Sequence, residues 1–179
     1  MSWQFQLPSN NPLYIKWLKE TQKLSASLRD VFENWHIRLL FQEKASLNVS
    51  DQYLLNVTSN ESWQRMIVHL DDQTPLIIGR VVVPEITFER YQDQLLNLKK
   101  RSIGDQLLFI DPKIKRSPFL FNEFSVQELQ FSQLPDWLFE QEDTSVTARS
   151  SIFHLNAEYP LMIEEYFLAS FFESLKANI

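Results

Sequence analysis

The sequence contains no cysteine among its 179 residues. This excludes disulfide frameworks, thiol nucleophiles and thiolate metal ligands, and it fits a reducing compartment. Glycine is almost as scarce, because only Gly79 and Gly104 occur where average usage would give roughly twelve. Glycine-rich phosphate loops and the G-x-S-x-G nucleophile elbow are therefore excluded. We expect each glycine to stand where the backbone needs a positive φ or a close approach.

Long apolar runs and a basic charge balance are also missing. No run approaches the roughly 20 apolar residues that span a bilayer. The opening segment, MSWQFQLPSNNP, lacks the basic and apolar regions of a signal peptide, so we expect a protein that is not secreted. Acidic residues outnumber basic ones by 23 to 17, for a net charge of −6, which argues against nucleic acid as a partner. We expect a monomer with one domain over residues 1–179 and no membrane span.

The periodicity of the apolar residues predicts an α+β fold. Helical spacing occurs over residues 13–32, 86–98 and 169–178. Alternating or β-branched runs predict strands over residues 46–58, 63–70, 76–84, 106–110, 119–124, 151–155 and 160–168. The short links between neighbouring runs favour hairpins. We therefore predict a single antiparallel β-sheet of about six strands with flanking helices.

Three charges interrupt runs that otherwise favour burial. Side chains alternate between the two faces of a strand, so Glu165 falls in an apolar row, and the neighbouring Glu164 faces the other way. Arg65 shares a face with Ile67, and Arg80 is the only charge within residues 76–83. Each guanidinium could pair with Glu165, or could bind a carboxylate ligand. The alternatives are a purely structural ion pair and side chains that reach solvent at a sheet edge.

The three histidines, His36, His69 and His154, show no spacing typical of metal ligands. We expect no metal site and interpret them as surface residues or as core residues with satisfied hydrogen bonds.

The order and spacing of several short motifs resemble the chorismate pyruvate-lyase family and its uncharacterised homologues in algal plastids. The motifs are W-x-R at Trp63–Arg65, GRVVVP at Gly79–Pro84, IG before LLF at Ile103–Phe109, RSSIF at Arg149–Phe153 and PLMIEEYFL at Pro160–Leu168. The resemblance covers roughly residues 61–110 and 148–169, and both glycines fall inside it.

The resemblance implies an enzyme that converts chorismate to 4-hydroxybenzoate and pyruvate, a step of quinone-precursor biosynthesis, without a cofactor. Arg65 would hold the ring carboxylate, the backbone of Ile103 would contact the ligand, and Glu165 would hydrogen-bond the ring 4-hydroxyl. Arg80 would be a further substrate-binding residue or would support one. The implied fold is an antiparallel sheet whose ligand site is closed over by helical flaps.

The sequence departs from the family pattern at several places, including Ile103 in place of leucine and Ala148 in place of a second arginine. The family's serine-methionine-threonine step, whose backbone contacts the ligand, has its best counterpart around Trp35, and the glycine of the leucine-glycine-x-x-proline lead-in is replaced by Lys99. These departures keep two alternatives open, a non-catalytic module that binds small aromatic carboxylates and a protein whose buried charges are structural. The abundance of Asn, Gln, Ile, Leu, Phe and Lys suits an AT-rich genome. We expect a plastid location if the gene is plastid-encoded, and a cytoplasmic one otherwise.

Overall fold

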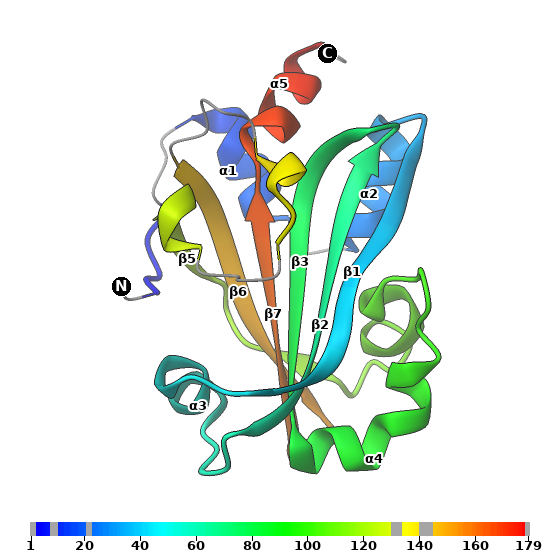
Figure 1. The fold of residues 1–179 in the computed structure, drawn as a ribbon, viewed down its shortest axis with the longest axis vertical. Helices are drawn as coiled ribbons and strands as arrows, with labels where there is room; N and C mark the ends of the chain where they lie inside the picture. Colours follow the sequence, from blue (N-terminus) through cyan, green and yellow to red (C-terminus); the bar gives the residue numbers. More distant parts are fainter. Residues whose placement is uncertain (1–2, 8–10, 21–22, 130–133, 140–144, 178–179) are drawn as a thin grey trace.

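The structure is a computed structural model that describes all residues except 1–2, 8–10, 21–22, 130–133, 140–144 and 178–179. One antiparallel sheet of seven strands forms its centre, in the order β1-β2-β3-β7-β6-β4, with β5 also pairing with β6 (Figure 1). The strands are β1 (Trp35–Ser46), β2 (Glu61–Asp71), β3 (Thr74–Pro84), β4 (Lys115–Arg116), β5 (Leu120–Ser125), β6 (Ser145–Leu155) and β7 (Tyr159–Phe167). The predicted fold class is confirmed.

Helices and helical turns cover both faces of the sheet. The α-helices are α1 (Pro12–Leu18), α2 (Leu24–Val31), α3 (Val49–Leu55), α4 (Glu85–Leu96) and α5 (Ala169–Ala177). A π-helical turn, η1 (Gly104–Leu108), follows α4, and two 3₁₀ turns, η2 (Val126–Glu128) and η3 (Asp136–Leu138), follow β5. Within the described residues, no helix is long and apolar enough to cross a membrane.

Two predicted strands are wrong. Residues 46–58 hold the end of β1 and then α3, which begins because the side chain of Asn48 accepts a hydrogen bond from the backbone N–H of Asp51. The helix ends at Asn56, whose φ of 53° is left-handed. Residues 106–110 fall in η1 and the turn after it, because a short apolar run does not distinguish a strand from a buried helical turn.

The strand register sorts the charged residues onto two faces. Gly79 of β3 lies between Ile67 of β2 and Glu165 of β7, and Glu165 lies opposite Arg149 of β6. We call this side, which also carries Arg65, the cavity face.

The other side of the sheet carries Arg80, which lies opposite Glu164. We call it the network face. The alternation of β7 thus separates Glu164 from Glu165, as the sequence predicts.

The core is divided between these two faces. On the cavity face, α1, α2 and α5 pack around Phe167, and α4 and η1 pack around Val81 and Phe153. On the network face, α3 covers Met162, and the segments that contain η2 and η3 cover Tyr166. Figure 1 views the sheet from the side that α3 covers, with α1 and α2 behind it.

Candidate functional site

A small, partly open cavity of about 70 Å³ lies on the cavity face, between the sheet and the segments that cover it. Its sheet wall includes Glu165 and Arg149, and its opposite wall includes Ile103 together with residues at the start of α2. Sequence positions far apart therefore meet here. Two of the predicted site residues, Glu165 and Ile103, line the same cavity.

Both glycines line this cavity, and at each position a neighbouring side chain lies where a Cβ atom would need room. A Cβ atom at Gly79 would lie 3.2 Å from Cγ1 of Ile67, and one at Gly104 would lie 2.9 Å from the ring of Phe109. Neither glycine has a positive φ. The expectation of a close approach is confirmed for both, and at Gly79 the side chain that approaches is that of Ile67.

Glu165 forms its ion pair with Arg149, a residue to which the sequence analysis gave no role. The Nε of Arg149 donates to the Glu165 carboxylate, and its Nη1 donates to the carbonyls of Trp17, Leu18 and Glu20 at 3.0, 3.1 and 2.8 Å. These carbonyls stand at the end of α1, where a cation is favoured. Arg149 therefore orients Glu165 and is itself fixed from the helix side. A period-two pattern could have placed Arg149 on this face, but the register across the hairpin decides the pairing.

Arg65 lies on the same face but is not part of the cavity wall. Its Nη1 donates to Oε1 of Gln42 at 2.7 Å, and its Nη2 donates to the carbonyls of Lys99 and Arg101 at 2.5 and 3.2 Å. The residue is 1% exposed, and burial lowers the pKa of Arg65 to about 10. Among the described residues, no carboxylate lies within ion-pairing distance of it. A buried guanidinium bound only by neutral oxygens favours an anionic ligand nearby.

Trp35, the expected counterpart of the family's N-terminal step, lies next to the cavity at the start of β1. Its indole ring stacks on His69, with ring centroids 5.7 Å apart and an angle of 22°. His69 lines the cavity and was interpreted from the sequence only as a surface or satisfied core residue. That interpretation is wrong, because His69 is buried and its Nδ1 has no hydrogen-bond partner.

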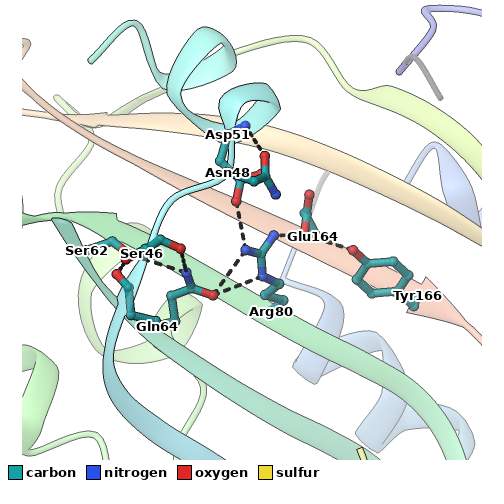
Figure 2. A network of polar contacts seen from close by, with 9 residues as sticks. Ser46, Asn48, Asp51, Ser62, Gln64, Arg80, Glu164 and Tyr166 are labelled. Atoms are coloured by element: carbon teal, nitrogen blue, oxygen red, sulfur yellow. Dashed lines mark hydrogen bonds and ion pairs between the residues drawn. The ribbon is translucent and has the colours of Figure 1, made fainter. Parts of the chain in front are cut away.

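Arg80 belongs to the other face of the sheet, so it does not pair with Glu165. Its guanidinium binds Glu164 and Asp51, each at 2.8 Å, and also Gln64, while the hydroxyl of Tyr166 donates to Glu164 at 2.8 Å (Figure 2). Burial alone would lower the pKa of Arg80, but the two carboxylates outweigh burial and raise it. The substrate contact expected for Arg80 finds no support in this arrangement, since the sheet separates Arg80 from the cavity.

The two faces also differ in charge. Three cationic side chains and one carboxylate line the cavity: Lys23, Arg116, Arg149 and Glu165. A wider hollow of about 670 Å³ on the network face is lined by four carboxylates and one guanidinium: Glu43, Asp51, Glu128, Glu164 and Arg80. Since like charges repel, an anionic ligand is favoured in the smaller cavity and disfavoured in the larger hollow. Within the described residues, no group of three or more His, Asp or Glu side chains is placed to hold a metal ion.

Comparison with known proteins identifies the family. The family model for chorismate lyase matches residues 2–176. The chain belongs to the chorismate lyase family. A probable chorismate pyruvate-lyase of Pseudoalteromonas translucida is 26% identical over 153 residues, which cover 86% of this chain and 82% of that protein. A probable chorismate pyruvate-lyase of Coxiella burnetii is 31% identical over 106 residues, which cover 57% of this chain and 53% of that protein.

The fold of this chain is similar to that of two solved domains. The C-terminal domain of PhnF gives a TM-score of 0.56 at 12% identity, covering 77% of this chain and 86% of that chain. The ligand-binding domain of a putative GntR-family transcriptional regulator from Bordetella bronchiseptica gives a TM-score of 0.52 at 10% identity. The match covers 75% of this chain and 84% of that chain. At such identities the likeness concerns the fold alone.

Proposed function

We propose that the protein is a chorismate pyruvate-lyase that converts chorismate to 4-hydroxybenzoate and pyruvate in the cavity of Glu165. The observation that carries the proposal is the excess of cationic side chains around this small cavity in a chain of this family. Chorismate carries two carboxylates. A dianion that leaves water for an enclosed site needs cationic partners, and arginine can remain charged when buried.

The reaction needs positioning more than it needs a reactive group. The bond between ring C3 and the ether oxygen breaks, and its electron pair leaves with enolpyruvate. The hydrogen on C4 is lost as a proton, and its electron pair completes the aromatic ring. The methylene carbon of enolpyruvate gains a proton and becomes the methyl group of pyruvate, so atoms and charge balance without a redox partner. The gain of aromaticity drives the reaction, and the protein orients the substrate and compensates its charge.

Each role follows from where the side chain lies. Glu165 is held by Arg149 on the cavity wall, where its carboxylate can accept a hydrogen bond from the ring 4-hydroxyl. Arg65 would bind the ring carboxylate in place of the carbonyls of Lys99 and Arg101 that it binds here. Ile103 lies in the same segment of the chain, two residues after Arg101, and lines the cavity. Its backbone would therefore contact the bound ligand near the ring carboxylate.

Substrate access requires the covering segments to move. The cavity of about 70 Å³ is far below the roughly 300–1,000 Å³ of common ligand pockets. The sheet is held by continuous ladders, whereas the cover consists of the start of α2 and the segment from Ser102 to Phe109. Opening of this cover agrees with the helical flaps that the family resemblance implies.

The test is to incubate the purified protein with chorismate and to quantify 4-hydroxybenzoate and pyruvate together. We expect equimolar products, a loss of at least about 100-fold in kcat for Glu165→Gln, and a raised KM for Arg65→Ala. Arg90→Ala removes an exposed guanidinium from α4 and serves as the matched control, with wild-type rates expected.

Near-wild-type turnover in Glu165→Gln would contradict the role given to Glu165. Saturable binding of 4-hydroxybenzoate without any product would identify a ligand-binding module instead. The supply of quinone precursors, a plastid location and a monomeric state stay predictions from the sequence.

A further inference from the structure

His69 is a buried imidazole without a hydrogen bond on the wall of the cavity. It is 4% exposed, its Nδ1 is fully enclosed, and neither ring nitrogen has a hydrogen-bond partner among the described residues. A buried polar nitrogen that lacks a partner is rare in native proteins and destabilises the fold. A bound ligand can supply the hydrogen bond that this nitrogen lacks.

The imidazole is neutral, and stacking holds it in place. Burial lowers the pKa of His69 to about 4, although the nearby charge of Glu165 acts in the opposite direction. A neutral imidazole carries one N–H donor and one acceptor nitrogen. The ring lies against the indole of Trp35, whose own Nε1 also lacks a partner. His69 can therefore offer a hydrogen bond to a ligand without adding charge to the cavity.

The strand register places His69 relative to the expected substrate contacts. On β2, Arg65, Ile67 and His69 follow one another on the cavity face, about 6.6 Å apart. Glu165 is level with Ile67 but two strands away, about 9.6 Å. Arg65 and His69 thus lie on opposite sides of the row that contains Ile67, Gly79 and Glu165.

This layout determines which edge of a bound ring would face His69. A ring that lies over Gly79, with C1 toward Arg65 and C4 toward Glu165, turns one of its two remaining edges toward His69. The opposite edge faces Ile163, beside which Ser151 of β6 also lines the cavity. A polar substituent next to C4 that faces the imidazole gives His69 the hydrogen-bond partner that it lacks among the described residues.

We infer that His69 is a substrate-binding residue that hydrogen-bonds the oxygen on ring C3, through which enolpyruvate leaves. This inference rests on the proposed function for the identity of the ring. The hydrogen bond holds the C3 oxygen in the ground state and becomes stronger as that oxygen gains negative charge. His69 transfers no proton in this role, because a neutral N–H that donates is sufficient.

The test compares two stable ligands that differ only at C3. Wild-type protein should bind 3,4-dihydroxybenzoate more tightly than 4-hydroxybenzoate, by roughly 3- to 10-fold, as one hydrogen bond allows. His69→Leu should reduce this ratio to about 1, while His69→Gln, which keeps a donor, should retain part of it. His154→Leu changes an exposed histidine on β6 and should keep the wild-type ratio. Isothermal titration calorimetry measures all four ratios.

Turnover provides a second readout. His69→Leu should lower kcat/KM for chorismate more than it weakens the binding of 4-hydroxybenzoate, which has no C3 oxygen. An unchanged ligand ratio in His69→Leu would overturn the inference, and continued turnover in that variant would leave the proposed function intact. A ratio that depends on His69 in a protein that forms no product would support the contact while removing the lyase reaction.

Discussion

The buried imidazole of His69 makes the stability of the fold depend on pH in a way that one substitution can isolate. In the unfolded chain His69 takes up a proton as the pH falls through 6.5, whereas in the fold it remains neutral until about pH 4. Between these values the unfolded state binds more protons than the native state. The free energy of unfolding therefore falls as the pH falls, and this contribution is constant above about pH 7.

The magnitude follows from the separation of the two pKa values. Each pH unit of this window is worth about 1.4 kcal/mol, so His69 should remove about 2 kcal/mol of stability by pH 5 and about 3 kcal/mol by pH 4. Other carboxylates and histidines titrate in the same range. They are present in both proteins when the wild type is compared with His69→Leu, so the difference between the two reports His69.

Urea unfolding, followed by tryptophan fluorescence at several pH values from 7.5 to 4, measures this difference. At pH 7.5 we expect His69→Leu to be as stable as the wild type or slightly more so, because the unpartnered nitrogen is gone. The two curves should then diverge as the pH falls, with the wild type losing more. Parallel curves would show that the imidazole is hydrated or hydrogen-bonded in the fold, and would refute the reasoning.

Three further substitutions test other parts of the structure. Arg80→Met leaves two buried carboxylates unpaired and should destabilise the fold by about 3–5 kcal/mol in urea unfolding; a loss below about 1 kcal/mol would mean that water reaches the network. Gly104→Ala places a Cβ 2.9 Å from the ring of Phe109, and the free energy of 4-hydroxybenzoate binding should change more than the free energy of unfolding. An unchanged affinity would place Phe109 outside the ligand's path. Lys99→Gly should stabilise the protein by about 0.5–1 kcal/mol in urea unfolding, because Lys99 has a φ of 50°; a destabilised variant would contradict this.

The alternation of side chains in strands was enough to predict the faces of the sheet. It separated Glu164 from Glu165 and placed Arg65 with Ile67, as the register shows. It could not predict partners, because the residue opposite Glu165 depends on how the hairpin pairs across β6 and β7. Arg149 was therefore missed as the partner of Glu165, and Arg80 was offered as one although it lies on the other face.

The pattern of apolar residues also failed to predict strand β1. The segment Trp35–Ser46 mixes charges and apolar residues because β1 is an edge strand, and no clear alternation marks it. Lys99 stands where the family pattern has a glycine. It keeps the left-handed conformation that glycine favours, and its carbonyl accepts the hydrogen bond of Arg65. The backbone at this point is thus compatible with the family pattern even though the side chain is not.

Glu164 and Glu165 show how neighbouring residues of one type can have different roles. The Glu164 carboxylate is shared between Arg80 and Tyr166 and is 2% exposed, so its interactions are complete within the chain. Among the described residues, Glu165 has one guanidinium partner, Arg149 on the neighbouring strand β6, and both side chains are part of the cavity wall. Arg149 is in turn held by the carbonyls at the end of α1, so it can fix the direction of Glu165 without enclosing it. A carboxylate that is oriented but not fully satisfied, beside an excess of cationic side chains, can accept a hydrogen bond from an anionic substrate.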